Sequence, residues 1–111
     1  MEKVLTIEGK PIKMKSDGGT ARMYRQYFKR DFIVELGFSE NKKNIDPEVV
    51  ENLAWTLAKR ADDSIPDIDE WLCQFESPLS IINKTRDIIS IITASTQSVV
   101  KPKKTKNQRR R

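Results

Sequence analysis

The sequence predicts a mainly α-helical domain of about four helices, with an N-terminal β-hairpin and a disordered basic C-terminal tail. Apolar residues recur at helical spacing in several segments between residues 20 and 93. Over residues 3–15 they alternate with polar residues at a period of two. From Ala94 on, serine, threonine and glutamine and then lysine and arginine predominate, which leaves little apolar surface to bury. We therefore expect one folded domain over residues 1–96 and a disordered tail over residues 97–111.

The predicted hairpin, residues 3–15, has one apolar face. Its two halves are separated by the turn-forming segment Glu8-Gly9-Lys10-Pro11. Because two strands alone are only marginally stable, this face should rest on helices. The apolar residues of the pattern are Leu5, Ile7, Ile12 and Met14.

The first predicted helix spans residues 20–36, with Thr20 as its N-cap and Gly37 as its C′ residue. A second face carries three cations, and we interpret it as a solvated face rather than a nucleic-acid contact. These cations are Arg22, Arg25 and Lys29. The apolar stripe contains Ala21, Tyr24, Phe28, Phe32 and Leu36, with Met23, Tyr27 and Val34 widening it.

The second predicted helix spans residues 46–62 and begins at Asp46-Pro47, an N-cap followed by proline at the first helical position. Trp55 lies off the apolar stripe of this helix. A large aromatic there either fills a gap against a neighbouring element or marks a protein-binding surface, and the sequence leaves both open. The stripe itself contains Val50, Leu53, Ala54, Leu57 and Ala61, flanked by Val49 and Ala58.

A third, short helix is predicted over residues 67–76. Pro66 cannot continue the preceding helix, and Asp67 provides an N-cap for the next one. Two large aromatic side chains on about two turns expose much apolar surface for so short a helix, so we expect this helix to pack against another element. Its stripe contains Ile68, Trp71, Leu72 and Phe75.

The last predicted helix spans residues 78–93, because Ser77-Pro78 repeats the signal of an N-cap followed by proline. The run of residues 88–93 is rich enough in β-branched side chains to form a strand instead. We favour a helix because its start signal is strong. The expected buried residues are Ile81, Ile82, Ile88, Ile89 and Ile92.

The composition argues against catalysis and against a metal or cofactor site. The 111-residue chain contains no histidine and a single cysteine, Cys73. This excludes zinc sites built from cysteine and histidine, an internal disulfide, and a nucleophile activated by histidine. Five neighbouring acids are explained more simply as helix caps and a solvated turn than as a metal or acid/base site. They are Asp62, Asp63, Asp67, Asp69 and Glu70.

The net charge of +5 comes from the C-terminal end. The chain has 21 basic and 16 acidic residues, and seven of the basic residues follow residue 100, where there is no acid. Such a tail could contact a phosphate backbone without sequence preference, or serve only to keep the protein soluble. No apolar run is long enough to span a membrane, so we expect a cytosolic protein. The possible tail contacts are Lys101, Lys103, Lys104, Arg109, Arg110 and Arg111.

Four sequence blocks, taken together in their order and spacing, form a specific pattern. They are residues 20–31 (TARMYRQYFKRD), residues 51–61 (ENLAWTLAKRA), residues 65–72 (IPDIDEWL) with Phe75, and residues 101–104 (KPKK). This pattern resembles the tail assembly chaperones of siphophages and prophages of Gram-positive bacteria. The chain departs from that family over residues 78–93, where the family is more acidic, and in its longer basic tail.

The resemblance implies a chaperone that is made in the host bacterial cytoplasm and is absent from the mature virion. Such a protein binds the tape measure protein, keeps it soluble and promotes assembly of tail tube protein around it. It also implies a longer, frameshifted form of the same chain, with a slippery site near Lys103-Lys104. The candidate client contacts are Trp55, Tyr27 and Trp71. The alternatives are a small phage protein that binds nucleic acid through its basic tail, and a structural tail protein; oligomeric state is left open.

Overall fold

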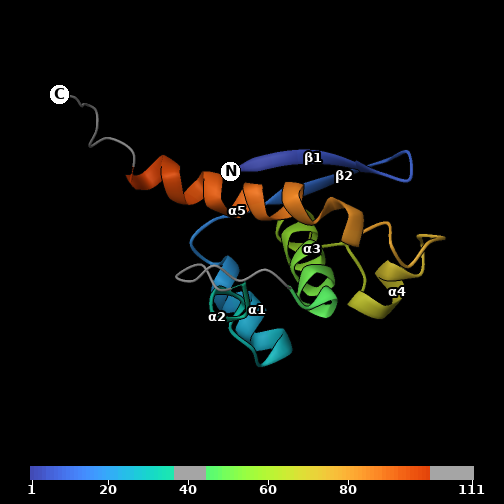
Figure 1. The fold of residues 1–111 in the computed structure, drawn as a ribbon, viewed down its shortest axis with the longest axis horizontal. Helices are drawn as coiled ribbons and strands as arrows, with labels where there is room; N and C mark the ends of the chain where they lie inside the picture. The colour runs from blue at the N-terminus through green and yellow to red at the C-terminus, as the bar shows by residue number, and fades with distance from the viewer. Residues whose placement is uncertain (37–44, 101–111) are drawn as a thin grey trace.

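The computed structural model describes the backbone of residues 1–36 and 45–100, and the side chains of residues 1–35 and 45–94. Within these residues the chain forms a two-stranded hairpin followed mostly by helices (Figure 1). Helix α3, Pro47–Ala61, stands at the centre. The hairpin and helix α5 lie side by side across one end of α3, while the short helices α1, α2 and α4 flank it. The predicted mainly helical fold with an N-terminal hairpin is confirmed.

The hairpin consists of β1, Glu2–Ile7, and β2, Lys10–Lys15, which pair antiparallel with Leu5 opposite Ile12. Its turn is Glu8-Gly9, where both residues have positive φ (54° and 76°), as a tight two-residue hairpin turn requires. The expectation that its apolar face rests on helices is confirmed, because that face packs on α3 and α5. The buried side chains of this face are Leu5, Ile7 and Met14.

The predicted single helix over residues 20–36 is wrong, because the chain forms two helices there. Helix α1 spans Thr20–Phe28 and helix α2 spans Phe32–Leu36. Between them Lys29 adopts a left-handed conformation (φ 59°), and its N–H donates to the Arg25 carbonyl at 2.9 Å. The break turns the chain so that the Phe32 ring meets Tyr24 edge-on, with ring centroids 5.3 Å apart.

The cap predicted at the start of α1 is also corrected. The N-cap residue is Gly19, while the Thr20 hydroxyl accepts the Asp17 N–H at 2.9 Å. Thr20 therefore closes the preceding turn instead of capping the helix. The predicted C′ residue, Gly37, lies outside the described residues.

Helix α3 begins as predicted, since the Asp46 carboxylate accepts the Glu48 N–H at 2.9 Å and Pro47 follows the cap. The buried surface of α3 is wider than the predicted stripe. Asn52 and Thr56 are buried as well as the apolar residues, because elements pack on several sides of this helix. A helix buried on most of its circumference does not show a single apolar stripe.

Helix α4, Ile68–Leu72, is shorter than the predicted 67–76, although its predicted N-cap is confirmed: Asp67 accepts the Glu70 N–H at 3.0 Å. The chain tightens after Leu72, because the Phe75 N–H donates to the Leu72 carbonyl at 3.1 Å, three residues back. The docking expected of this segment is confirmed, since Trp71 and Phe75 are both buried.

The last predicted helix, 78–93, begins later and ends later than expected. Residues 82–84 form a short 3₁₀ helix, η1 (Ile82–Lys84), and helix α5 follows over Thr85–Val100. Helix rather than strand is confirmed for residues 88–93, with Ile88, Ile91 and Ile92 buried. Helix α5 continues to Val100, into the first residues of the predicted tail, and residues 101–111 of that tail lie outside the described residues, so the predicted disorder stays a prediction.

Candidate protein-binding surface

Two of the three predicted client contacts belong to the core. Trp55 and Trp71 are each only 2% exposed. The Trp55 indole N–H donates to the Pro66 carbonyl at 2.8 Å, and the Trp71 ring packs edge-on against Phe75, with centroids 5.4 Å apart. For Trp55, the open choice between core and partner surface is thus decided in favour of the core. The prediction that these two indoles form a contact surface is corrected accordingly.

The third predicted contact, Tyr27, lies at the surface. Its side chain is 55% exposed, yet its ring meets Trp55 edge-on with centroids 4.9 Å apart. Phe28 meets the same indole at 5.6 Å, so α1 covers Trp55 with two rings. Tyr27, together with the exposed Ile33 and Val34 of α2, is called the α1–α2 surface here. Val34 was expected on the buried stripe, but it is 70% exposed because α2 starts a new helix after the break at Lys29.

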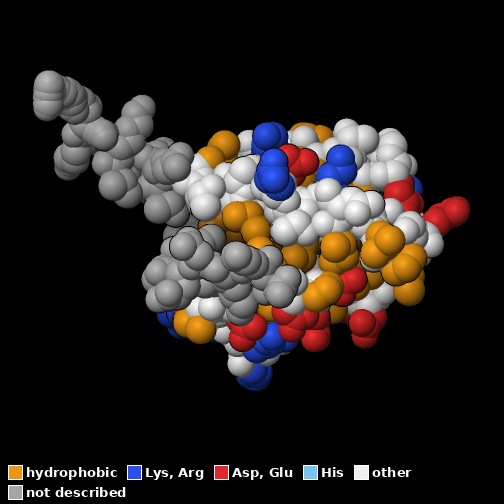
Figure 2. Space-filling view, viewed as in Figure 1, with side chains coloured by type: hydrophobic (Ala, Val, Ile, Leu, Met, Phe, Trp, Pro, Cys, Tyr) orange, Lys and Arg blue, Asp and Glu red, His pale blue; other side chains and the backbone are white. Residues whose placement is uncertain are grey.

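A second apolar area is hollowed and lies between α3, α4 and the segment that follows α4. Its volume is about 330 Å³, and we name it the α3–α4 hollow. Figure 2 shows apolar side chains gathered on the side of the molecule that carries α4 and this segment. Leu79, in the same segment, is 57% exposed. The hollow is lined by Glu51, Leu72, Cys73, Phe75, Glu76, Ser77, Pro78 and Ile81.

The hairpin tip holds one wall of the hollow in place. The Glu8 carboxylate accepts the N–H groups of Glu76 at 2.9 Å and Ser77 at 3.0 Å, and it also accepts the Ser80 hydroxyl. The Ser80 bond, followed by the two backbone bonds, lowers the pKa of Glu8 from its usual 4.5 to about 2. Sequence reasoning missed this contact, because Glu8 and its partners are separated by about seventy residues.

Lys10 makes a second connection from the same tip. Its ammonium donates to the Gln74 carbonyl at 2.7 Å and lies 5.5 Å from the centre of the Phe75 ring. A cation over a ring face is attracted by the ring quadrupole. The wall of the hollow therefore has a defined position set by two charged side chains of the hairpin.

Both charged residues in the lining of the hollow are acidic, while the Lys10 ammonium lies at its wall over the Phe75 ring. The lining includes Glu51 and Glu76 but no lysine or arginine. Desolvation, and then repulsion from Glu48 and Asp46, raises the pKa of Glu51. Within the described part of the chain, no cation forms an ion pair with Glu51 or Glu76. The hollow is thus an apolar depression whose two lining carboxylates have no ion-pair partner among the described residues.

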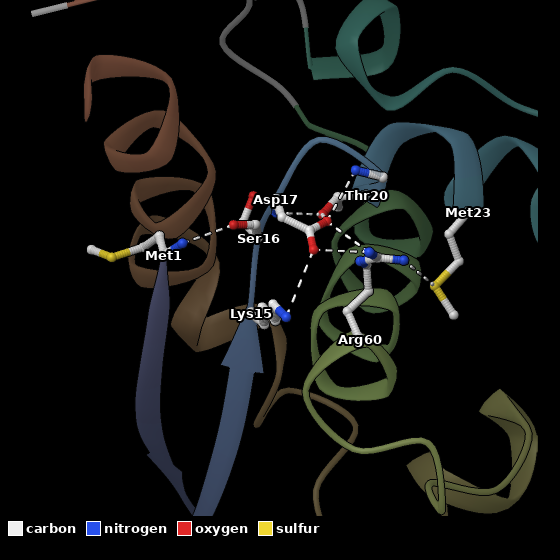
Figure 3. Close-up of polar contacts among 8 residues, drawn as sticks. Met1, Lys15, Ser16, Asp17, Thr20, Met23 and Arg60 are labelled. Carbon is white, nitrogen blue, oxygen red and sulfur yellow. Dashed lines mark hydrogen bonds and ion pairs between the residues drawn. The ribbon is translucent and has the colours of Figure 1, made fainter. Parts of the chain in front are cut away.

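A separate polar cluster at the far end of α3 has a structural role (Figure 3). The Arg60 guanidinium lies 2.8 Å from both carboxylate oxygens of Asp17, and this contact lowers the pKa of Asp17. Gly19 allows the approach, since a Cβ there would lie 2.9 Å from the guanidinium. The Met1 amine donates to the Ser16 carbonyl at 2.9 Å. The Met1 bond joins the two ends of the hairpin to each other, and the Arg60–Asp17 contact fastens the segment after β2 to α3.

The remaining predicted residues are placed as follows. The cations Arg22, Arg25 and Lys29 are exposed, as a solvated face requires. The five acids of the turn before α4 are exposed too, and no metal-binding group of histidine, cysteine or acid side chains is found among the described residues. Among those residues, no helix combines the length and apolar character needed to cross a membrane. The predicted tail contacts, which are Lys101, Lys103, Lys104, Arg109, Arg110 and Arg111, lie outside the described residues.

Comparison with known proteins adds no family. No family model, no curated protein and no solved structure matches this chain. Fold and surface therefore define the chain only as a mostly helical domain with two open apolar areas, and the chaperone family stays a prediction that depends on the four sequence blocks.

Proposed function

We propose that this chain is a phage tail assembly chaperone that binds the tape measure protein, keeps it soluble and promotes assembly of tail tube protein around it. The observation that carries the proposal is the apolar surface that the folded domain leaves open. The α1–α2 surface exposes Tyr27, Ile33 and Val34 to solvent, and the α3–α4 hollow is an apolar depression with the exposed Leu79 in the segment beside it. Open apolar areas of this kind are typical of protein-binding sites. The four sequence blocks add independent support from the resemblance.

The proposed mechanism is binding without a chemical reaction. A chaperone of this type lowers the free energy of a soluble client by covering apolar surface that would otherwise aggregate. The buried indoles Trp55 and Trp71 contribute indirectly, since they fix the helices that carry the two open areas. The chain would need no metal and no cofactor.

The proposal places the protein in the host bacterial cytoplasm during tail assembly and outside the mature virion. Its partners are the tape measure protein, tail tube protein and a frameshifted longer form of the same chain. Mass spectrometry of purified particles tests the location: a chaperone is absent from particles, whereas a structural tail protein is present in them.

Co-expression with the tape measure protein of the same phage tests the function. With the full chain present, we expect most of the tape measure protein in the soluble fraction; without it, most should be insoluble. Equal solubility in both conditions would overturn the proposal.

The basic tail keeps nucleic-acid binding as a second candidate, because seven basic residues after residue 100 are accompanied by no acid. Binding of duplex DNA that falls steeply with salt and disappears when residues 101–111 are removed would favour this alternative. The chaperone proposal expects instead that removal of the tail leaves client solubility unchanged.

A further inference from the structure

The α3–α4 hollow differs from an ordinary apolar area because of the carboxylates in its lining. Leu72, Phe75 and Ile81 make it apolar, while Glu51 and Glu76 add negative charge. Glu51 is partly buried and stands beside Glu48 on the same helix. A partly desolvated carboxylate among like charges raises the free energy of the isolated protein, and a bound cation would lower it.

We infer that the α3–α4 hollow docks a polypeptide segment that inserts an apolar side chain and pairs flanking lysine or arginine with Glu51 and Glu76. The inference deepens the proposed function and depends on it in one respect, namely that the segment belongs to the client. The volume of about 330 Å³ is at the lower end of the roughly 300–1,000 Å³ of ligand pockets and suits one or two side chains.

Charge complementarity selects this occupant. An apolar segment without cations would exclude water from Glu51 and leave its charge uncompensated, which is costly. A segment with acidic flanks would add repulsion from both carboxylates. The tail of this chain provides cations, but its apolar side chains after Val100 are limited to Pro102, which is too small to fill the hollow. A client segment that has both an apolar side chain and flanking cations fits the hollow, unlike the three other occupants.

The hollow is also prepared for binding before the partner arrives. Glu8 holds the backbone of Glu76 and Ser77, and Lys10 holds the Gln74 carbonyl. Since these bonds order the wall in the free protein, the partner does not have to order it on binding. This favours a specific docking point over a surface that adapts to any apolar chain.

Calorimetric titration of the full chain with two designed helical peptides tests the inference. The peptides share one leucine-rich face and differ only in flanking residues, which are lysine in one and glutamate in the other. We expect the lysine-flanked peptide to bind at least about tenfold more tightly at low salt, with the difference shrinking as salt is raised. Equal affinity of the two peptides would overturn the inference.

Variants locate the contact. Replacing both carboxylates, Glu51→Gln with Glu76→Gln, should weaken the lysine-flanked peptide by about tenfold. Glu70→Gln is the matched control, because Glu70 is an exposed acid on α4 that does not line the hollow. The same loss in the control would overturn the inference. So would amide chemical-shift changes that map to α2 instead of the hollow, or a Glu51-dependent dimer in sedimentation, which would make a second copy the occupant.

The co-expression assay separates this inference from the proposed function. If the double variant keeps the tape measure protein as soluble as the wild type does, the client does not dock at the hollow, but the proposed chaperone function is retained. If the lysine-flanked peptide docks in the hollow but the tape measure protein stays insoluble, the function is wrong and the docking site stands.

Discussion

Aromatic rings pack on two sides of helix α3, but the groups that surround these rings differ between the two sides. On the α1 side, Tyr27 and Phe28 close over Trp55 and leave apolar side chains exposed on α2. On the α4 side, the Trp71–Phe75 pair is accompanied by the charged tip of the hairpin and by a hollow. The first side offers exposed apolar side chains without a hollow that the structure defines. The second adds charge and a fixed shape, which are the means by which a protein selects a partner.

The largest effect should come from removing the ring at the centre of the α1 side. Trp55→Ala loses the contacts with Tyr27 and Phe28 and the hydrogen bond to Pro66. We expect the free energy of unfolding in urea to fall by about 3–5 kcal/mol. Tyr27→Ala is the control, because its ring is half-exposed and should cost much less. A Trp55→Ala variant as stable as wild type would show that this side is a surface rather than a core.

A smaller, pH-dependent effect should come from the hairpin tip. Because the pKa of Glu8 is lowered from 4.5 to about 2 in the folded protein, its charged form stabilises the fold above pH 4.5, and this contribution is lost as pH falls toward 2. The urea midpoint of wild type should therefore converge on that of Glu8→Gln over this range. Glu70→Gln serves as a matched carboxylate control. Parallel curves for wild type and Glu8→Gln would contradict the role of Glu8.

Glycine at position 29, between α1 and α2, should raise the free energy of unfolding. Lys29 holds a left-handed conformation (φ 59°), which glycine adopts without the steric cost of a Cβ. We expect Lys29→Gly to raise the free energy of unfolding by about 1 kcal/mol, while Lys29→Ala gives no such gain. Destabilisation by glycine would indicate one continuous helix, as the sequence pattern predicted.

The smallest effects on stability should come from variants of exposed side chains in the two open areas, and peptide binding should distinguish the two areas. Val34→Ser on α2 and Leu79→Ser beside the hollow both alter exposed side chains, so each should change the unfolding free energy by less than about 0.5 kcal/mol. In the titration with the lysine-flanked peptide, only Leu79→Ser should weaken binding. Weaker binding by Val34→Ser alone would move the selective site to the α1 side.

Features set by neighbours in sequence were predictable, and features set by distant contacts were not. Asp46 and Asp67 cap helices through backbone groups two and three residues away, so their patterns were sufficient. The break at Lys29 is accompanied by contacts between residues farther apart in the sequence: Arg30 forms ion pairs with Glu35 and with Asp46. The helical spacing of apolar residues does not predict such a contact.

The candidate site was predicted least well. An apolar stripe predicts burial for one face of a helix only, so it placed Trp55 outside the buried face of a helix that other elements in fact surround. The hollow combines residues of α3, α4 and the segment after α4, and its wall depends on Glu8 at the other end of the chain. Only the assembled fold brings these residues together.

Hydrogen exchange on the complex of this chain with the tape measure protein of its phage shows whether the domain acts by covering apolar client surface. We expect a soluble complex in which backbone amides of residues 72–81 become protected, while those of β1 exchange as in the free protein. If no complex forms, or if protection appears only away from the two open apolar areas, the claim that this domain acts by covering apolar client surface is wrong.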